Sequence, residues 1–486
     1  MRSFDIFDTL IARKCIWPQA IFSLVEQRIG SPGFATLRIR AEAELQGTEH
    51  TLDDIYRRMI SNGGMDVEFA ERARTMELAT ELENVIPIAA QLQRVRDGDL
   101  LISDTPLPAE FLVQLLERAG LRRTVSIWRS ALGKSGGETW RTLAATGLQF
   151  THLGDNPHSD GIMPRQQGIP AEVAAVALPT EVEQFLLQQG WTGTALIARA
   201  LRLGIAERDE TAATLCLLQA SINVPILLIA SMHLLQLAAS TEFAADKMLF
   251  SSRDCHAWLR LFRCLGRATN APRSPDSEYF FTSRIARLSG SPDYLRYFRK
   301  TAGPRSIVVD LCGTGVSLAA LYSRAGVVPH TFLLHRIDAG SSHDAYRQRF
   351  GGDSPEMRYL LASSQGLGNV AMELLNLVNH GMVTDMVDTG RELFIPRSVE
   401  NSFGPEQVLL IDRMSDLVDR ACALVEDPLL AQQLLAQDTR LGMAKVQQAL
   451  VPLWQLADRS DLLTRCFGSA CLEENRRILA DLGCGS

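Results

Sequence analysis

The sequence predicts an α/β protein with two domains, each built on a parallel sheet. With 486 residues, the chain is too long for one ordinary hydrophobic core. Short apolar segments alternate with helical segments over residues 1–170, and a second strand–loop–helix pattern begins near Lys247. Because short apolar strands that alternate with helices are typical of sheets buried on both faces, both patterns indicate parallel sheets.

Composition excludes several classes of protein. Lys and Arg total 49 against 56 Asp and Glu, so a basic surface for nucleic acid is not expected. Nine cysteines occur without a CxxC pair or a Cys/His cluster at zinc spacing, which favours a reducing compartment. The first ten residues include three charged side chains, unlike a signal peptide. We therefore expect a cytoplasmic protein.

One stretch, Ala212–Ser240, has no charged residue and is long enough to span a bilayer. It also contains several polar side chains, and Pro225 lies near its middle. Proline removes a backbone donor and breaks or kinks a helix. The stretch therefore predicts two buried helices that are broken at Pro225, and no transmembrane segment is expected.

The elements of the first domain follow from apolar runs and turn residues. A strand at the extreme N-terminus ends near Asp5, and a long helical segment with a break at Gly63-Gly64 follows. The remaining elements, in order, are a strand at Asp99–Ser103, a helix at Pro108–Ala119, a strand at Thr124–Ile127, a loop with Lys134, and a strand at Phe150–Leu153 that leads into Gly154-Asp155.

A domain boundary is predicted between Pro170 and Gly204. The predicted elements beyond it are strands at Lys247–Ser252, Tyr279–Ser283 and Ser306–Asp310, a helix at Leu318–Ala325, and C-terminal helices at Gln407–Leu424, Leu429–Ala449 and Glu473–Leu482.

Polar residues at the strand ends of the first domain predict a site for phosphoryl transfer. The carboxyl ends of parallel strands meet in one crevice, so these residues should lie together. Asp5 could attack phosphorus and form an aspartyl-phosphate. Ser103 and Lys134 could bind the transferring oxygens and offset their charge. Asp155, together with Asp5, could bind Mg²⁺, which prefers oxygen ligands.

The order and spacing of these four sequences resemble the haloacid dehalogenase (HAD) superfamily over residues 1–175. The resemblance implies a Rossmann-like parallel sheet with a helical cap at about residues 15–95. It also implies a Mg²⁺ site made by Asp5, the backbone carbonyl of Phe7, Asp155 and Asp160.

The sequence departs from the HAD phosphatases at Phe7, where that family has an aspartate that acts as general acid and base. Asp8 is the next acidic residue and the candidate for catalysis, although the proton-transfer role does not carry over to it. Dehalogenases have an aromatic residue at this position but need no metal, so the acidic residues Asp155 and Asp160 favour a phosphatase. Arg13 either reaches a substrate phosphate or is a solvated arginine at the start of a helix.

A second cluster follows the predicted strand Ser306–Asp310. Gly313 and Gly315 allow close backbone approach, and the loop opens a helix whose N-terminus favours an anion. The hydroxyls of Thr314 and Ser317 could donate to phosphate, with Val316 between them. The segment is either a phosphate-binding loop with a carboxylate beside it or an ordinary strand-to-helix turn.

This loop resembles the phosphoribosyl pyrophosphate (PRPP) motif of phosphoribosyltransferases. Asp310, Thr314, Gly315 and Ser317 match the motif, whereas Val309 stands where the family commonly has a second acid. The resemblance implies that a turn after an earlier strand binds pyrophosphate. The residues that fit this role are Arg253 and Asp254, with charge added by Arg284 and Arg287.

The pairing of the two domains resembles the two-domain ribofuranosyltransferases of bacterial polysaccharide assembly. It implies that residues 205–400, a phosphoribosyltransferase-like α/β domain, transfer ribofuranose 5-phosphate from PRPP to a glycan acceptor of an O-antigen or capsule. The HAD domain would then remove the 5-phosphate with Mg²⁺, and residues 401–486 would form a helical C-terminal region. The resemblance also implies association with the membrane-bound machinery of glycan assembly.

Two alternatives stay open. The chain could be a stand-alone HAD phosphatase with a non-catalytic C-terminal domain, or a non-enzymatic interaction protein, since Phe7 removes the usual acid and base.

Overall fold

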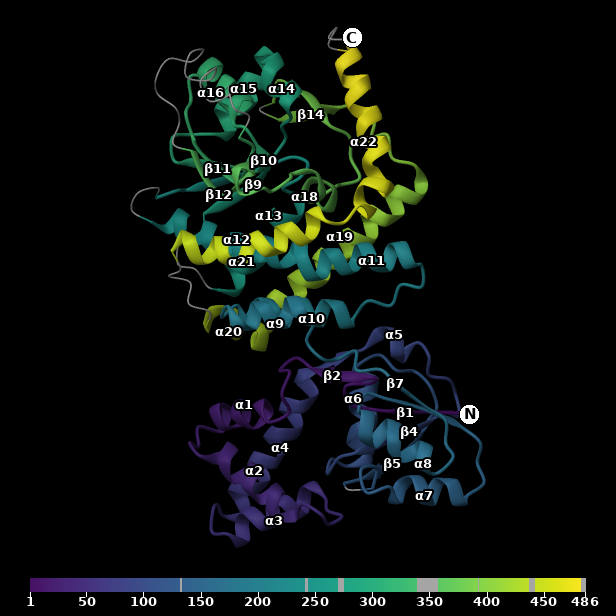
Figure 1. The fold of residues 1–486 in the computed structure, drawn as a ribbon. Coiled ribbons are helices and arrows are strands. Elements are labelled where there is room, and N and C mark those ends of the chain that lie inside the picture. The colour runs from purple at the N-terminus through teal and green to yellow at the C-terminus, as the bar shows by residue number, and fades with distance from the viewer. Residues whose placement is uncertain are drawn as a thin grey trace. The chain divides into compact units, whose positions relative to one another are not determined.

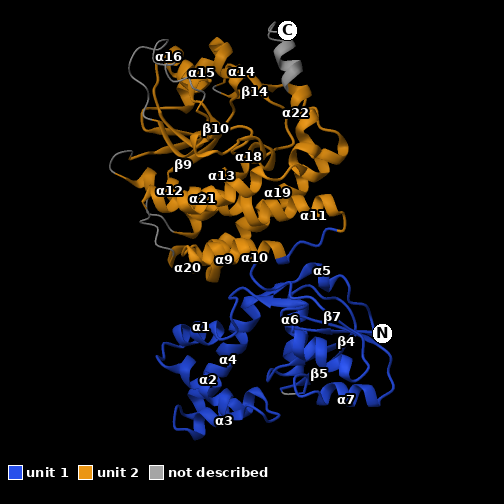
Figure 2. Ribbon diagram, viewed as in Figure 1, with its two compact units in different colours: residues 1–180, 203–207 blue, residues 181–202, 208–486 orange. Residues whose placement is uncertain are grey.

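The computed structural model describes residues 1–131, 133–240, 244–269, 275–338, 357–391, 393–436 and 442–481. The chain divides into two compact units (Figure 2). Unit 1 comprises residues 1–180 and 203–207, and unit 2 comprises residues 181–202 and 208–486. Each unit contains a five-stranded parallel sheet with helices, so the predicted α/β class with two parallel sheets is confirmed.

The sheet of unit 1 has the order β5-β4-β1-β6-β7, with β1 at its centre (Figure 1). Its strands are β1 (Arg2–Asp5), β4 (Leu100–Asp104), β5 (Ser126–Ser130), β6 (Thr151–Gly154) and β7 (Ala171–Val173), and all neighbours pair in parallel. Helices α6 (Ala109–Arg118), α7 (Glu138–Ala145) and α8 (Met163–Gln166) connect them. Apolar residues of α6 recur at helical spacing and are buried, as expected for a helix packed on a sheet.

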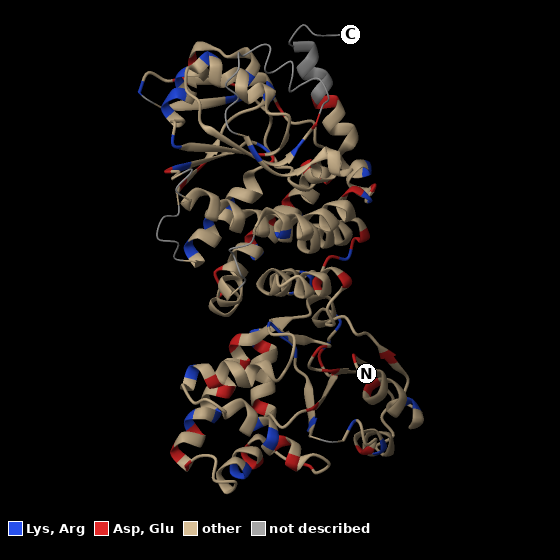
Figure 3. Cartoon of the chain, turned by 60° about the vertical axis from the view of Figure 1, so that its left-hand side comes forward, with Lys and Arg blue, Asp and Glu red and all other residues tan. Residues whose placement is uncertain are grey.

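A helical insertion separates β1 from β4. It leaves the sheet through β2 (Ile11–Arg13) and returns through β3 (Val85–Pro87), which pair antiparallel. Between them lie α1 (Ala20–Ile29), α2 (Phe34–Leu45), α3 (Leu52–Ser61) and α4 (Val67–Asn84), and the short α5 (Ala89–Leu92) follows β3. The predicted break at Gly63-Gly64 is confirmed, since α3 ends before it and Gly63 has a φ of 71°. Acidic and basic residues are intermixed over these helices (Figure 3).

The sheet of unit 2 has the order β12-β11-β10-β8-β9. Its strands are β8 (Lys247–Ser251), β9 (Asp276–Phe280), β10 (Ser306–Gly313), β11 (His330–Arg336) and β12 (Met357–Ala362), all paired in parallel. The predicted strand at Tyr279–Ser283 is misplaced, because the strand is β9 and ends at Phe280. Ser283 instead caps α14 (Arg284–Ser289) by accepting a hydrogen bond from the Ala286 amide.

Helices cover both faces of this sheet and include the C-terminal helices of the chain. The described helices between the strands of this sheet are α13 (His256–Ala268), α14, α15 (Pro292–Thr301) and α16 (Val316–Ala325). The others are α9 (Glu181–Gln188), α10 (Thr192–Leu203), α18 (Val370–Leu375), α19 (Pro405–Val425), α20 (Pro428–Ala436), α21 (Met443–Asp458) and α22 (Leu462–Asp481), and a small antiparallel pair is formed by β13 (Val383–Asp388) and β14 (Phe394–Ser398). The end of the predicted helix Glu473–Leu482 and residues 437–441 lie outside the described residues.

The predicted helix break at Pro225 is wrong. Helix α11 (Glu210–Leu218) continues through a π-helical segment, Gln219–Asn223, into α12 (Val224–Ala239). The proline lies in the first turn after the widened segment, where a missing backbone donor is tolerated. Among the described residues, this is the one helix that is long and apolar enough to cross a bilayer, and its most apolar window is 72% buried within the protein.

Candidate active site

Three carboxylates meet at the carboxyl edge of the unit 1 sheet. Asp5 is the last residue of β1, and Asp155 directly follows β6, the neighbouring strand. Asp160 lies in a π-helical segment, Pro157–Ile162, just beyond. Each of the three offers an oxygen, and these oxygens lie within 4.8 Å of one another. The predicted convergence of these residues is therefore present in the structure.

Lys134 joins two of these carboxylates. Its Nζ donates to Asp5 Oδ1 at 2.5 Å and to Asp160 Oδ1 at 2.6 Å, and the residue is only 3% exposed. The backbone amide of Lys134 donates to the Asp104 carboxylate, which fixes the loop against the end of β4. Ser103 is buried on the same strand, one residue beyond Ile102, the register partner of Asp5. The site thus places a buried cation beside the predicted nucleophile.

Asp160 reaches the site because its segment folds back over β6. A Cβ on Gly154 would lie 2.3 Å from the Asp160 Cγ, so this close approach requires glycine. The Asn156 side chain accepts hydrogen bonds from the amides of His158 and Ser159 and begins the segment. The Asn156 amide itself donates to Asp160 Oδ2 at 3.1 Å.

Four supporting contacts were missed by the sequence analysis. His152 Nε2 lies 3.1 Å from Asp160 Oδ1, and His152 Nδ1 lies 2.8 Å from the Ser3 hydroxyl. Burial lowers the pKa of His152, so the ring is neutral and donates from Nε2 while Ser3 donates to Nδ1. Thr9 also donates to Asp5 Oδ2 at 3.1 Å, and the Asp104 carboxylate accepts from the Lys134 amide. The alternation of inward residues on a strand was the available signal for Ser3 and His152.

The electrostatics of the site reflect crowded negative charge. Burial raises the pKa of Asp5 to about 7, opposed by Lys134 and assisted by the other two carboxylates. Burial and the nearby Asp8 raise the pKa of Asp155 to about 6. Burial disfavours the charged form of Asp160 too, but His152 and Lys134 lower its pKa to about 2. A divalent cation would relieve this repulsion, and an all-oxygen donor set is what Mg²⁺ prefers. The carboxylates therefore fit the metal that the sequence predicted.

The turn after β1 carries Phe7 and Asp8. Ile6 accepts backbone hydrogen bonds from two residues of the turn, and Asp8 adopts a left-handed conformation with a φ of 58°. Asp8 is partly buried and close enough to Asp155 to raise its pKa. The aromatic ring of Phe7 lies under the Arg13 guanidinium, 4.2 Å from its centroid.

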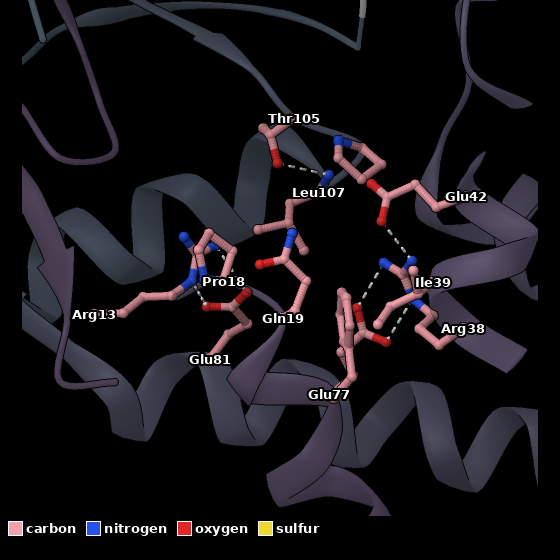
Figure 4. A pocket seen from close by; sticks show the side chains of 12 residues that line it. Arg13, Pro18, Gln19, Arg38, Ile39, Glu42, Glu77, Glu81, Thr105 and Leu107 are labelled. Carbon is pink, nitrogen blue, oxygen red and sulfur yellow. Dashed lines mark hydrogen bonds and ion pairs between the residues drawn. The ribbon is translucent and has the colours of Figure 1, made fainter. Parts of the chain in front are cut away.

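Arg13 is not the solvated arginine at a helix start that was one of its two predicted roles, since it lies in β2. Its Nε and a terminal nitrogen donate to the two carboxylate oxygens of Glu81 at 2.8 and 2.9 Å. Both side chains are largely buried. The arginine is thus part of a buried ion pair with Glu81 (Figure 4), and its predicted contact with a substrate phosphate stays a prediction.

A second cluster lies at the carboxyl edge of the unit 2 sheet. The strands β8 and β10 are neighbours, although β9 comes between them in the chain and lies on the far side of β8. Connections therefore diverge between β8 and β10, and such a switch point opens a crevice at the carboxyl ends of the strands. The predicted pyrophosphate-binding residues Arg253 and Asp254 follow β8, and the predicted phosphate-binding segment runs from Asp310 at the end of β10 to Ser317 in α16.

The strand that leads into the glycine-rich loop is longer than predicted. Strand β10 extends to Gly313, and α16 begins at Val316. Gly315 has a φ of 76°, a left-handed conformation that favours glycine, and the flexible end of the Met357 side chain packs against it. The Thr314 hydroxyl accepts a hydrogen bond from the Val316 amide at 3.4 Å.

Arg287 connects the two loops of this cluster. Its guanidinium donates to Asp310 Oδ2 at 3.1 Å, to the Ser317 hydroxyl at 3.4 Å and to the Ser251 hydroxyl at 3.2 Å. It is buried, at 7% exposure. The structure thus brings together Asp310, Ser317 and Arg287, whereas Arg284 lies exposed at the start of α14.

The remaining arginine of the cluster is paired with a residue that the sequence analysis missed. Arg253 follows a cis peptide bond and donates to both carboxylate oxygens of Glu474 at 2.8 and 2.7 Å. Burial and the charge of Glu373 raise the pKa of the adjacent Asp254 to about 7. Neither Glu373 nor Glu474 lies in a recognisable motif, so no sequence signal placed them here.

No protein-family model matches the chain, and no curated protein matches it either. The two clusters therefore stand on their own geometry.

Proposed function

We propose that unit 1 is a phosphatase of the HAD type. The observation that carries this proposal is the buried contact of Lys134 with Asp5 and Asp160 at the end of a central parallel strand. A carboxylate held beside a buried ammonium group, with two further carboxylates at 4.8 Å or less, suits nucleophilic attack on a phosphate ester.

Each residue of the site has a separate role in the proposed reaction. Asp5 attacks phosphorus, the ester oxygen leaves with a proton, and water then hydrolyses the aspartyl-phosphate and regenerates Asp5. Lys134 offsets negative charge on the transferring oxygens, and Thr9 orients the second Asp5 oxygen. The resemblance leaves the general acid and base unassigned, and we propose Asp8 for this proton because its charge acts on Asp155 in the carboxylate cluster.

Asp5, Asp155, Asp160 and the backbone carbonyl of Phe7 would hold Mg²⁺. The ion would supply positive charge to the phosphate oxygens when it is bound. His152 keeps Asp160 ionised and oriented toward that position.

Unit 2 we assign to transfer of a phosphoribosyl group from PRPP to a glycan hydroxyl. Support comes from the switch point in strand order between β8 and β10, where a glycine-rich loop follows β10 and the buried carboxylate of Asp310 accepts a hydrogen bond from Arg287. The amides of residues 313–317 would bind the 5-phosphate, and Asp310 would bind the ribose hydroxyls. Arg253, Asp254 and Arg284 would bind the leaving pyrophosphate. The phosphatase would then remove the 5-phosphate and make the sequence irreversible.

One observation favours a second candidate function. The guanidinium group of Arg253 already donates to both carboxylate oxygens of Glu474. That of Arg287 already donates to Asp310 and to neighbouring hydroxyls. If pyrophosphate does not displace these pairs, unit 2 is not a transferase and the chain is a phosphatase with a non-catalytic second unit.

Two assays separate these functions. Release of inorganic phosphate from ribose 5-phosphate with Mg²⁺ tests unit 1, and we expect Asp5→Asn to abolish it while the surface variant Asp53→Asn retains it. Calorimetric titration with PRPP and Mg²⁺ tests unit 2. We expect binding that Ser317→Ala weakens about ten- to a hundredfold through one lost bond to a charged group. If Asp310→Ala and Ser317→Ala both bind PRPP as tightly as the wild-type protein does, the transferase assignment is overturned.

A further inference from the structure

The helix α22 contacts the turn that follows β8, where Arg253 is predicted to bind pyrophosphate. Glu474 of α22 accepts a hydrogen bond from each terminal nitrogen of Arg253, at 2.8 and 2.7 Å. The exposed fraction is 3% for Glu474 and 10% for the Arg253 side chain. Two parallel N–H bonds to one carboxylate are the strong form of this contact. The arginine is thus occupied by a residue 221 positions later in the sequence.

The backbone of the turn is held independently of α22. The Ser252 hydroxyl donates to the Thr282 carbonyl at 2.6 Å and accepts from the Thr282 amide at 2.9 Å. The Ser252 amide donates to the Phe280 carbonyl, also at 2.9 Å. These bonds tie the turn to the end of β9 and to the residues that follow it. Loss of the contact with Glu474 should therefore free the Arg253 guanidinium without displacing the turn.

Glu474 and a pyrophosphate group would use the same nitrogens of Arg253. A guanidinium group binds carboxylates and phosphates alike, through pairs of N–H bonds. Both terminal nitrogens already donate to Glu474, and the carboxylate offsets the charge of the arginine. Pyrophosphate oxygens at this position would also repel the carboxylate. The ion pair and the binding of pyrophosphate to Arg253 therefore compete.

The packing of α22 differs between its two halves. In the first half, the buried apolar side chains that the structure describes are Leu463, Phe467 and Ala470. In the second half, Leu472 and Glu473 are exposed, and Glu474 is buried. Apolar packing thus holds the first half, whereas the ion pair with Arg253 holds the described part of the second half. The second half can move away from the turn once that pair opens.

We propose that α22 is an autoinhibitory strap on unit 2: Glu474 holds Arg253 while no substrate is bound, and the pyrophosphate group of PRPP must displace it. The proposal rests on the transferase function proposed above. It makes the paired state of Arg253 the resting state of a transferase rather than a sign of a non-catalytic unit.

A positioning ion pair and an inhibitory one predict opposite effects when the Glu474 charge is removed. If Glu474 orients Arg253 for the ligand, Glu474→Gln should weaken the binding of pyrophosphate. If Glu474 competes with the ligand, the same substitution should strengthen it, because the apparent affinity rises with the fraction of molecules in which Arg253 is free. The direction of the change separates the two roles.

Calorimetric titration with inorganic pyrophosphate and Mg²⁺ measures this direction. Every protein also carries Asp5→Asn, so that unit 1 does not hydrolyse the probe. We expect Glu474→Gln to bind pyrophosphate about tenfold or more tightly than the parent protein, as for a competent state populated at about 10% or less. Glu473→Gln removes an equal charge from an exposed neighbour and should leave the affinity unchanged. Adding Arg253→Met to Glu474→Gln should abolish the gain.

Hydrogen exchange of the parent protein gives a readout that needs no substitution in α22. Saturating pyrophosphate should speed amide exchange in peptides from the second half of α22 and leave peptides from β11 unchanged. The β11 peptides also show whether Glu474→Gln is folded.

Tighter binding by Glu474→Gln, together with faster exchange in α22 of the parent protein, supports the strap. Equal or weaker binding, a gain that survives Arg253→Met, or exchange in α22 that pyrophosphate leaves unchanged or slows would overturn the strap, while the pyrophosphate site stands. If none of the proteins binds pyrophosphate, the transferase function fails and the strap fails with it.

Discussion

Replacing Lys134 with methionine should destabilise unit 1 strongly. The substitution keeps the length and apolar stem of the side chain but removes the charge that lies 2.5 Å from Asp5 and 2.6 Å from Asp160. Loss of one partner of a buried ion pair typically costs about 3–5 kcal/mol, because the remaining charge stays buried without compensation. The control is Lys14, a partly buried residue whose ammonium group donates an exposed hydrogen bond to the Glu83 backbone carbonyl.

The loss of stability of unit 1 that Lys134→Met causes should depend on pH. The pKa of Asp5 is raised to about 7 and that of Asp155 to about 6, so both are protonated in the folded protein at pH 5. Lys134 then offsets the charge of Asp160 alone. As pH rises through 6 and 7 the carboxylates ionise, and the stabilisation from Lys134 grows. The loss on Lys134→Met should therefore be larger at pH 8 than at pH 5, with divalent cations removed by chelation.

Hydrogen exchange followed by mass spectrometry measures this effect in each unit separately. At pH 8, peptides from β1 and β4 should exchange about a hundred- to several-thousand-fold faster in Lys134→Met, after correction for intrinsic rates. Peptides from β10 and β11 serve as the internal reference. Lys14→Met should change exchange little, since exposed charges contribute about 0–1 kcal/mol. A change in β1 of less than fivefold, or an equal change at pH 5 and pH 8, would refute the electrostatic reasoning.

Three further predictions follow from single contacts. Gly154→Ala should displace Asp160, whose Cγ lies 2.3 Å from the added Cβ, and should weaken Mg²⁺ binding in calorimetry at least tenfold; unchanged affinity would contradict the role of this glycine. Arg287→Met should lower the free energy of unfolding of unit 2 by about 3–5 kcal/mol in urea titrations, because Asp310 loses its buried partner, and a loss below 1 kcal/mol would argue against it. Burial and the charge of Glu373 raise the pKa of Asp254 to about 7, above its ordinary value. The folded state therefore binds this proton more tightly than the unfolded state, and the stability of unit 2 falls as pH rises toward 7. The melting temperature of unit 2 should therefore drop more between pH 5 and pH 8 in wild-type protein than in Asp254→Asn, and parallel curves would contradict the assignment.

The residues at the strand ends were the part of the site that could best be predicted from the sequence. Asp5, Lys134 and Asp155 lie where apolar strands end, and parallel sheets bring those ends together irrespective of the loop lengths between them. The same reasoning placed Asp310 and Ser317 in one loop of unit 2. Local pattern and sheet geometry are enough for such residues.

Ion-pair partners that are brought together only by tertiary packing could not be predicted from the sequence. Glu474 reaches Arg253 across more than two hundred residues, and Glu81 reaches Arg13 from the far end of the insertion. No local pattern encodes either contact. The continuity of α11 and α12 was missed for a related reason, since a π-helical segment accommodates Pro225 and buried neighbours stabilise a helix that local propensity would end.

Trapping of a phosphorylated enzyme tests the central claim most directly. Wild-type protein is mixed with radiolabelled acetyl phosphate and Mg²⁺, quenched in acid within milliseconds to seconds, and digested for peptide analysis. The account predicts label on the peptide that contains Asp5, released by hydroxylamine as expected of an acyl phosphate, and absent from Asp5→Asn. Label that persists in Asp5→Asn, or hydrolysis of acetyl phosphate without label on this peptide, would contradict it.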